Sequence, residues 1–379
     1  MTGMEIIFLF SLWSILYVYL IYPVLVFIFS LFYRPVVRVR GYRPTVSVIL
    51  SAYNEELYIE QKIISLLAQA YSKEQMEILV GSDGSTDHTD EIILRYKDSG
   101  VKYFRQALRS GKPAMLNLLV RQAKGEVLVF IDARQGLEEN AIAELVSNLV
   151  VSDVGSVSGQ LVFRKEKQIG KAGDGVGLYW QYEKLIRYCE SRTGSMLGAT
   201  GAFYAIRREL YTPLPEDIVL DDVYIPLTIA LKGYRAVYDE EARIYDNVSA
   251  NAQNEFARKT RTLAGNYQLL KYIPGLLNPF RGRIYWQFFS HKLLRLIVPF
   301  LLIALLISNV FILDYFIYRV IFILQFVLYF LAVLGVTIKR PNRFTDVPAM
   351  FCVMNAAALA GAYRFLTQRQ DVKWERTDR

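Results

Sequence analysis

The sequence contains few of the residues that usually build metal clusters. Its 379 residues include two cysteines and two histidines. Cys189 and Cys352 cannot form a metal cluster by themselves, and two isolated thiols do not make a disulfide framework. His88 and His291 are predicted to lie on separate helices, so we do not expect a histidine metal centre. These shortages exclude zinc-ribbon and disulfide-scaffold proteins.

Signs of nucleic-acid binding and of repeat architecture are also missing. The net charge is +8, but no stripe of basic and aromatic residues and no known nucleic-acid motif accompanies it. We find no internal repeat, and the apolar runs are nearly uncharged, so no transport pathway is indicated. The positive charge therefore indicates membrane flanks and anionic ligands.

Long stretches without charge are plentiful. Residues 6–33 contain no charged side chain, and this run exceeds the roughly 20 residues that a spanning helix needs. Two more spans are predicted at Leu296–Leu313 and Tyr315–Ile338, and a weaker candidate lies at Val347–Leu366. The sequence therefore predicts an integral protein of the inner or plasma membrane.

Cationic flanks predict the orientation. Arg34, Arg38, Arg40 and Arg43 follow the first run, so residues 34 onward are expected in the cytoplasm. A third C-terminal span would place the basic tail on the other side. Val347–Leu366 is therefore either a span or a re-entrant or interfacial segment.

The block between the spans alternates strand-like and helical patterns, as βαβ units around a mostly parallel sheet do. Three of its strand-like runs stop at acidic residues, namely Glu55, Asp83 and Asp132. Ligands of such sheets bind beyond the carboxyl ends of the strands. We expect a single polar site there.

These motifs together resemble glycosyltransferase family 2, in particular its membrane-embedded synthases of cellulose, chitin, hyaluronan and poly-N-acetylglucosamine. The resemblance implies an α/β GT-A fold with N- and C-terminal transmembrane helices. It divides the chain into an anchor (1–42), a catalytic domain (43–250), amphipathic interface helices (251–295) and a C-terminal transmembrane region with a tail (296–379).

The resemblance also implies residues for the donor, a nucleotide-sugar and most simply a UDP-sugar. Tyr53 and Glu55 match the first nucleotide-binding loop, and Asp83 matches the residue that reads base and ribose. Lys112 follows a glycine before a helix and is expected near a phosphate, although ordinary helix-start solvation is the alternative. Arg261 on the interface helix is a predicted diphosphate clamp, with Arg258 where the family has glutamine.

Asp132 opens the sequence Asp-Ala-Arg where the family has the Asp-x-Asp metal motif. Mg²⁺ or Mn²⁺ on oxygen ligands would neutralise the leaving diphosphate. Arg134 cannot bind a metal, so either Asp132 holds the ion with other groups or Arg134 itself neutralises phosphate.

The acidic pair Asp221 and Asp222 matches the family's general base, with Asp222 as the base and Asp221 in support. Helix capping is the alternative role. Thr200 and Gly201 match the loop beneath the acceptor. The tryptophan that supports a growing chain is replaced by Thr262, and Trp180 could stack on a sugar instead or pack in the interior.

The predicted function is therefore an inverting glycosyltransferase of polysaccharide synthesis in the cell envelope, with nucleotide-sugar, glycan or lipid-linked acceptor and membrane lipids as partners. It acts either as a processive synthase or by adding one sugar to a lipid-linked acceptor. A catalytically inactive sugar-binding or scaffold subunit is the rival class. A homo-oligomer is compatible with the sequence, and nucleic acid is not an expected partner.

Overall fold

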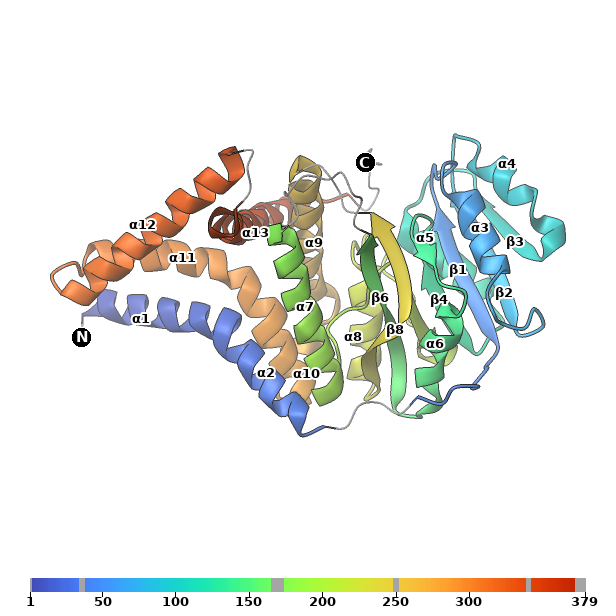
Figure 1. The fold of residues 1–379 in the computed structure, drawn as a ribbon, viewed down its shortest axis with the longest axis horizontal. Helices are drawn as coiled ribbons and strands as arrows, with labels where there is room; N and C mark the ends of the chain where they lie inside the picture. The colour runs from blue at the N-terminus through green and yellow to red at the C-terminus, as the bar shows by residue number, and fades with distance from the viewer. Residues whose placement is uncertain (1, 34–37, 165–173, 248–251, 339–341, 372–379) are drawn as a thin grey trace.

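The computed structural model describes residues 2–33, 38–164, 174–247, 252–338 and 342–371. Figure 1 shows two regions: an α/β body at one end and a group of long apolar helices at the other. Helices α7 (Asp174–Thr193) and α9 (Ala252–Tyr272) stand between them.

One eight-stranded sheet forms the body, in the order β3-β2-β1-β4-β7-β6-β8-β5. Strands β3, β2, β1 and β4 are parallel neighbours, whereas β7 runs antiparallel to both β4 and β6. The strands are β1 (Val46–Ala52), β2 (Met76–Asp83), β3 (Val101–Gln106), β4 (Val127–Ile131), β5 (Gly136–Leu137), β6 (Val154–Arg164), β7 (Phe203–Arg207) and β8 (Arg235–Asn247).

The sheet is buried on both faces because helices cover each side. Along β1, Val48 and Leu50 join one hydrophobic cluster, whereas Ile49 joins the other, as expected for side chains that alternate across a strand. The helices of the body are α3 (Ile59–Leu67), α4 (Thr89–Leu94), α5 (Lys112–Gln122), α6 (Ala141–Ser147) and α8 (Asp221–Leu231). The GT-A-like α/β fold is thus confirmed. It includes β3, which we did not predict.

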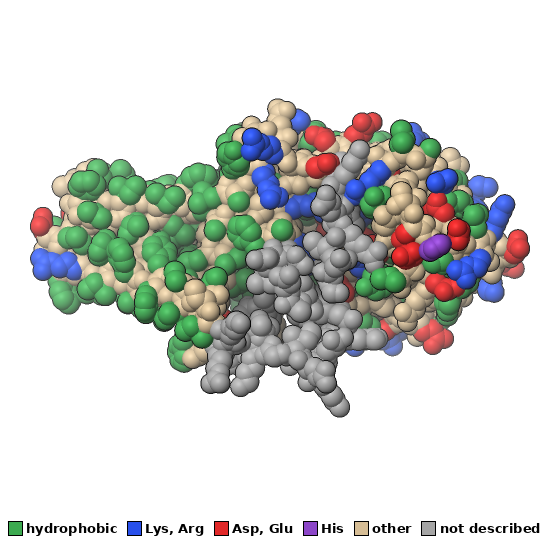
Figure 2. All heavy atoms as spheres, turned by 90° about the horizontal axis from the view of Figure 1, so that it is seen from above, with side chains coloured by type: hydrophobic (Ala, Val, Ile, Leu, Met, Phe, Trp, Pro, Cys, Tyr) green, Lys and Arg blue, Asp and Glu red, His purple; other side chains and the backbone are tan. Residues whose placement is uncertain are grey.

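Among the described residues, four helical runs are long and apolar enough to cross a membrane: Gly3–Leu31, Arg283–Val310, Phe316–Thr337 and Phe344–Leu366. They contain α1 (Gly3–Leu16), α2 (Tyr22–Leu31), α10 (Arg283–Gln287), α11 (Leu294–Val310), α12 (Phe316–Thr337) and α13 (Arg343–Leu366). Figure 2 shows apolar side chains over this end of the molecule, while charged side chains gather over the α/β body.

The predicted boundary between the interface helices and the C-terminal region, at 295/296, falls inside one helical run, Arg283–Val310. Two segments of π-helix, Tyr17–Ile21 and Phe288–Leu293, lie within the first and second apolar runs. His291 and Arg295 are accommodated in the second run because they face Glu183 and Glu190 of α7.

Helix α13 crosses the other apolar helices: Figure 1 shows it nearly end-on, while α1, α11 and α12 lie across the view. It packs on α9 so closely that a Cβ on Gly361 would lie 2.9 Å from the backbone nitrogen of Ala264. Whether 347–366 spans the membrane or lies in its interface stays a prediction.

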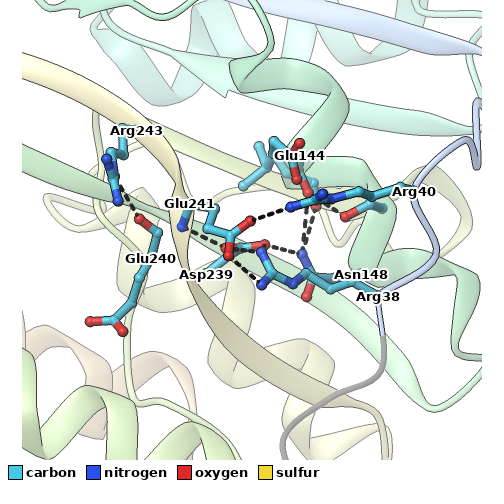
Figure 3. Close-up of polar contacts among 10 residues, drawn as sticks. Arg38, Arg40, Glu144, Asn148, Asp239, Glu240, Glu241 and Arg243 are labelled. Carbon is cyan, nitrogen blue, oxygen red and sulfur yellow. Dashed lines mark hydrogen bonds and ion pairs between the residues drawn. The ribbon is translucent and has the colours of Figure 1, made fainter.

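The segment after the first apolar run forms ion pairs with strand β8. Arg38 pairs with Asp239 at 3.1 Å and with Glu241 at 2.8 Å, and Arg40 reaches Glu241 at 3.4 Å (Figure 3). Arg38 and Arg40 are therefore partners of β8 as well as flanking charges, while Arg34 lies outside the described residues.

Candidate active site

The site lies at one edge of the sheet. Strands β2, β1 and β4 are adjacent and parallel, so Asp83, Glu55 and Asp132, which end or follow them, lie along the same edge. The sequence predicted that the three strands followed by acidic residues end at the same edge of the sheet, and the strand order and register confirm this.

Asp83 holds a loop in place. Its two carboxylate oxygens accept hydrogen bonds from the backbone N–H groups of Ser110 (2.7 Å) and Gly111 (2.8 Å). Gly84, at φ +69°, lets the chain pass close by, because a Cβ there would lie 2.8 Å from the nitrogen of Arg109. Asp83 thus orients the segment that leads into α5, and its contact with a base or ribose stays a prediction.

Tyr53 lies under the guanidinium of Arg109, whose central carbon is 3.8 Å from the ring centroid. The next residue, Asn54, adopts a left-handed backbone conformation at φ 53°. Its side-chain oxygen accepts a hydrogen bond from the backbone of Thr86 at 2.8 Å, which ties the loops after β1 and β2 together. The result is an aromatic surface with a cation, suited to a nucleotide.

Lys112 connects two acidic groups. It is the first residue of α5, and its ammonium lies 3.0 Å from Asp132 and 3.5 Å from Asp221. Burial acts to lower the pKa of Lys112, but the surrounding carboxylates outweigh it and raise the pKa above the ordinary lysine value. Lys112 is therefore a fixed positive charge between the metal motif and the acidic pair.

The acidic pair begins α8 without capping it. Asp221 and Asp222 are the first two residues of the helix, and the cap residue Leu220 makes no side-chain cap hydrogen bond. Asp221 is buried and accepts a hydrogen bond from the Tyr204 hydroxyl at 3.3 Å. The capping alternative is therefore wrong.

Asp222 faces the loop that precedes β7. A Cβ on Gly201 would lie 2.7 Å from a carboxylate oxygen of Asp222, so only glycine leaves room for it. Burial, followed by the charge of Asp221, raises the pKa of Asp222 to about 6, while Lys112 and Arg187 oppose the rise. A carboxylate with this pKa is suited to accept a proton near neutral pH.

Arg134 contacts Glu55. Its Nε lies 3.3 Å from one carboxylate oxygen of Glu55 and 3.4 Å from the other, and its guanidinium lies over the Tyr58 ring at 5.9 Å. Both side chains are largely buried. Arg134, which stands where the family has the second carboxylate of its metal motif, therefore forms an ion pair with Glu55.

Helix α9 brings a second arginine to the acids. Burial lowers the pKa of Arg261. The negative charges of Asp221, Asp222 and Asp132 oppose this shift, so Arg261 interacts electrostatically with all three. Arg258, one turn earlier, is exposed. The structure thus brings Arg261 to the site, whereas it leaves Arg258 at the surface.

Trp180 and Thr200 lie beside the same small hollow. Together with Arg187 they line this hollow between α7 and the loop before β7. The Arg187 guanidinium lies over the Trp180 ring at 5.6 Å. An aromatic face beside the Gly201 loop is consistent with the predicted acceptor contact.

Several site residues escaped the sequence reasoning, namely Lys62, Arg109, Arg187 and Tyr204. Lys62 of α3 is buried, contacts the carbonyl of Gln135, and has its pKa lowered to about 8 by burial, against the opposing charge of Asp132. Its only signal was a lysine at an apolar helical position. The other three belong to motifs that look like ordinary strand, loop or helix sequence.

Comparison with known proteins agrees with the fold and with the predicted family. Residues 47–212 match the model of glycosyl transferase family 2. The chain is 25% identical over 235 residues to poly-β-1,6-N-acetyl-D-glucosamine synthase of Staphylococcus aureus (strain COL), which covers 59% of this chain and 55% of that protein. It is 23% identical to the probable glycosyltransferase YdaM of Bacillus subtilis (strain 168), over 89% of this chain and 87% of that protein.

A solved structure has the same fold. The mannosyltransferase PcManGT from Pyrobaculum calidifontis, in complex with GDP-Man and Mn²⁺, superposes with a TM-score of 0.73 over 97% of this chain and 99% of that one, at 22% identity. The chain spans about half the length of the Staphylococcus synthases that it matches.

Proposed function

We propose that this chain, a glycosyltransferase whose residues 47–212 form a family 2 domain, moves a sugar from a nucleoside diphosphate sugar to an acceptor hydroxyl with inversion at the anomeric carbon. The observation that carries the proposal is the pair of buried Asp221 and half-buried Asp222 beside Lys112 and Asp132. We propose an acceptor that is either a growing polysaccharide or a lipid-linked glycan.

In the proposed step, Asp222 accepts the proton of the acceptor hydroxyl. The hydroxyl oxygen forms a bond to the anomeric carbon while the bond from that carbon to the diphosphate breaks, and the nucleoside diphosphate leaves with the electron pair. Asp221 keeps its position through Tyr204 and Lys112 and holds the helix start in place. Lys112 and Arg261 supply positive charge where the diphosphate accumulates negative charge.

The Asp132 carboxylate is partly exposed and fits one ligand position of a divalent cation. Within the described ranges, no group of three or more His, Cys, Asp or Glu side chains could hold a metal. Mg²⁺ or Mn²⁺ at Asp132 would therefore complete its shell with oxygens of the donor and water, and it would act as a Lewis acid on the diphosphate.

Addition of a single sugar to a lipid-linked acceptor is the second candidate. Thr262 stands where a chain-supporting tryptophan would mark a processive synthase, and Trp180 lies on α7 instead. The length of the product formed from a radiolabelled sugar nucleotide separates the two: one added sugar supports this candidate, and a ladder of products supports the synthase.

A donor panel tests the proposal itself. Purified full-length protein is incubated with UDP- and GDP-sugars, each with Mg²⁺, Mn²⁺ or a chelator, and release of the nucleoside diphosphate is measured. We expect release from one donor class and its loss with the chelator. Absence of release from every donor, with membrane lipid extract present as acceptor source, would contradict the proposed function.

A further inference from the structure

A cavity of about 420 Å³ lies between the α/β body and the apolar helices. This is within the size range of small-molecule sites, roughly 300–1,000 Å³. Its walls come from the first apolar run, α7, α9, the 283–310 run and α13. In Figure 1 it therefore belongs to the junction where α7 and α9 meet the apolar helices.

The walls of the cavity differ in chemistry. On one side α13 contributes Val347, Met350, Phe351 and Met354, which belong to a run apolar enough to enter a membrane. On another side, the described residues of the lining include four cations, Arg187, Lys259, Lys292 and Arg295, and one carboxylate, that of Glu183. An occupant that satisfies both walls is an amphiphile with a negative head.

The single carboxylate is already engaged. Glu183 contacts Arg295 and lies 3.2 Å from Nε2 of His291, whose Nδ1 lies 2.7 Å from Glu190. Tyr22 of the first apolar run donates a hydrogen bond to the same Glu190 oxygen. This network pairs Arg295 with Glu183, whereas neither Arg187 nor Lys292 forms an ion pair with a carboxylate of the described residues.

Among the cations of the cavity, Lys292 indicates most directly that the occupant is an anion. In the part of the chain that the structure describes, its ammonium has no hydrogen bond or ion pair, although it lines the cavity beside buried His291. A cation in such surroundings is costly unless an anion accompanies it. Arg187 and Lys259 lie over the rings of Trp180 and Tyr179, at 5.6 and 5.1 Å.

The cavity is connected to the catalytic acids through shared residues. Trp180 and Arg187 line both this cavity and the hollow at Thr200, and the charge of Arg187 acts on Asp222. A head group bound by Lys292 and Arg187 would thus place whatever it carries toward the proposed base.

We propose that this cavity binds the phosphate-bearing end of a lipid-linked acceptor, with Lys292 and Arg187 as phosphate ligands and the lipid chain along α13. This inference rests on the proposed function and names its acceptor class. A neutral glycan alone would leave the charges of Arg187 and Lys292 without an anion.

Binding of a short lipid phosphate tests the inference. Full-length protein in detergent is titrated with radiolabelled farnesyl phosphate, and unlabelled farnesol and inorganic phosphate serve as competitors. We expect saturable binding that neither competitor displaces at equal concentration. Equal displacement by farnesol would reveal a purely apolar pocket, and equal displacement by phosphate a free-anion site; either result overturns the proposal.

Charge variants locate the site. Lys292→Gln and Arg187→Gln should each weaken binding about tenfold or more, because each removes a charge-assisted contact, whereas Lys292→Arg should retain it. Lys271→Gln, on exposed α9 surface, is the matched control for general attraction. Unchanged binding by both Lys292→Gln and Arg187→Gln, or an equal loss in Lys271→Gln, contradicts the proposal, and thermal unfolding verifies that each variant is folded.

Asp222→Asn separates this inference from the proposed function. It should bind farnesyl phosphate like the unaltered protein while losing sugar transfer. Retained transfer would refute the proposed base and leave the binding result standing. Lost binding in Asp222→Asn would refute the separate lipid site.

Discussion

At the scale of single residues, the site depends on a lysine placed among carboxylates. Lys112 contacts Asp132 and Asp221 and also lowers the pKa of Asp222. The sequence located Lys112, Asp132 and Asp222 through short motifs, but it could not show that Lys112 joins the two acidic groups. That contact depends on α5 and α8 approaching the same sheet edge from distant parts of the chain.

Replacement of Lys112 should change the pH dependence of transfer. Asp222 acts as a base only when deprotonated, so activity should fall as the pH drops through about 6. Lys112→Gln removes a charge that lowers this pKa, so activity should already fall at a higher pH. The pH profile of kcat/KM measures the shift, with exposed Lys124→Gln as the control; an unmoved acid limb would refute the role of Lys112.

At the scale of elements, strand ends and helix starts position the chemistry. Short apolar runs predicted β1, β2 and β4, because strands that are buried on both faces appear in the sequence as nearly continuous apolar segments. Strand β3 was missed because Lys102 and Arg105 interrupt its apolar pattern, and its place in the sheet comes from pairing with β2. The ion pair between Arg134 and Glu55 was also unforeseeable, because it joins loops 79 residues apart.

The loop before β7 must carry glycine at 201 if it is to leave room for the base. Gly201→Ala would place a methyl group 2.7 Å from the Asp222 carboxylate and displace it. We expect transfer to fall about 10²-fold, the usual effect of a displacement near 1 Å, with little change in thermal unfolding. Gly198→Ala in the same loop meets only the Val223 side chain and serves as the control. Equal activity of the two variants would refute this role.

At the scale of the whole molecule, polar contacts connect α7 to the apolar helices, and a cavity lies at the same junction. The apolar runs were evident from the sequence because hydropathy is a local property. The direction of α13 and the pairing of His291 and Arg295 with α7 were not, since they depend on how separate helices pack. Cytoplasmic placement of the body stays a prediction.

Arg38 should contribute more to this connection than Arg40. Arg38 pairs with Asp239, which is 2% exposed, whereas the Arg40 side chain is 80% exposed. Arg38→Ala should lower stability by about 1–3 kcal/mol, because it removes a charged partner of a buried carboxylate. Arg40→Ala should cost no more than about 1 kcal/mol. Thermal unfolding of the two variants in detergent compares them, and equal midpoints would contradict this ranking.

The proposed reaction depends on Asp222 as the base and on a donor bound at the sheet edge. The most direct test compares Asp222→Asn with the unaltered protein in transfer of labelled sugar, with exposed Asp217→Asn as the matched control. Loss of the base should lower transfer about 10²–10⁴-fold while donor binding persists. Transfer by Asp222→Asn at the rate of the unaltered protein would contradict the role of Asp222 as the base.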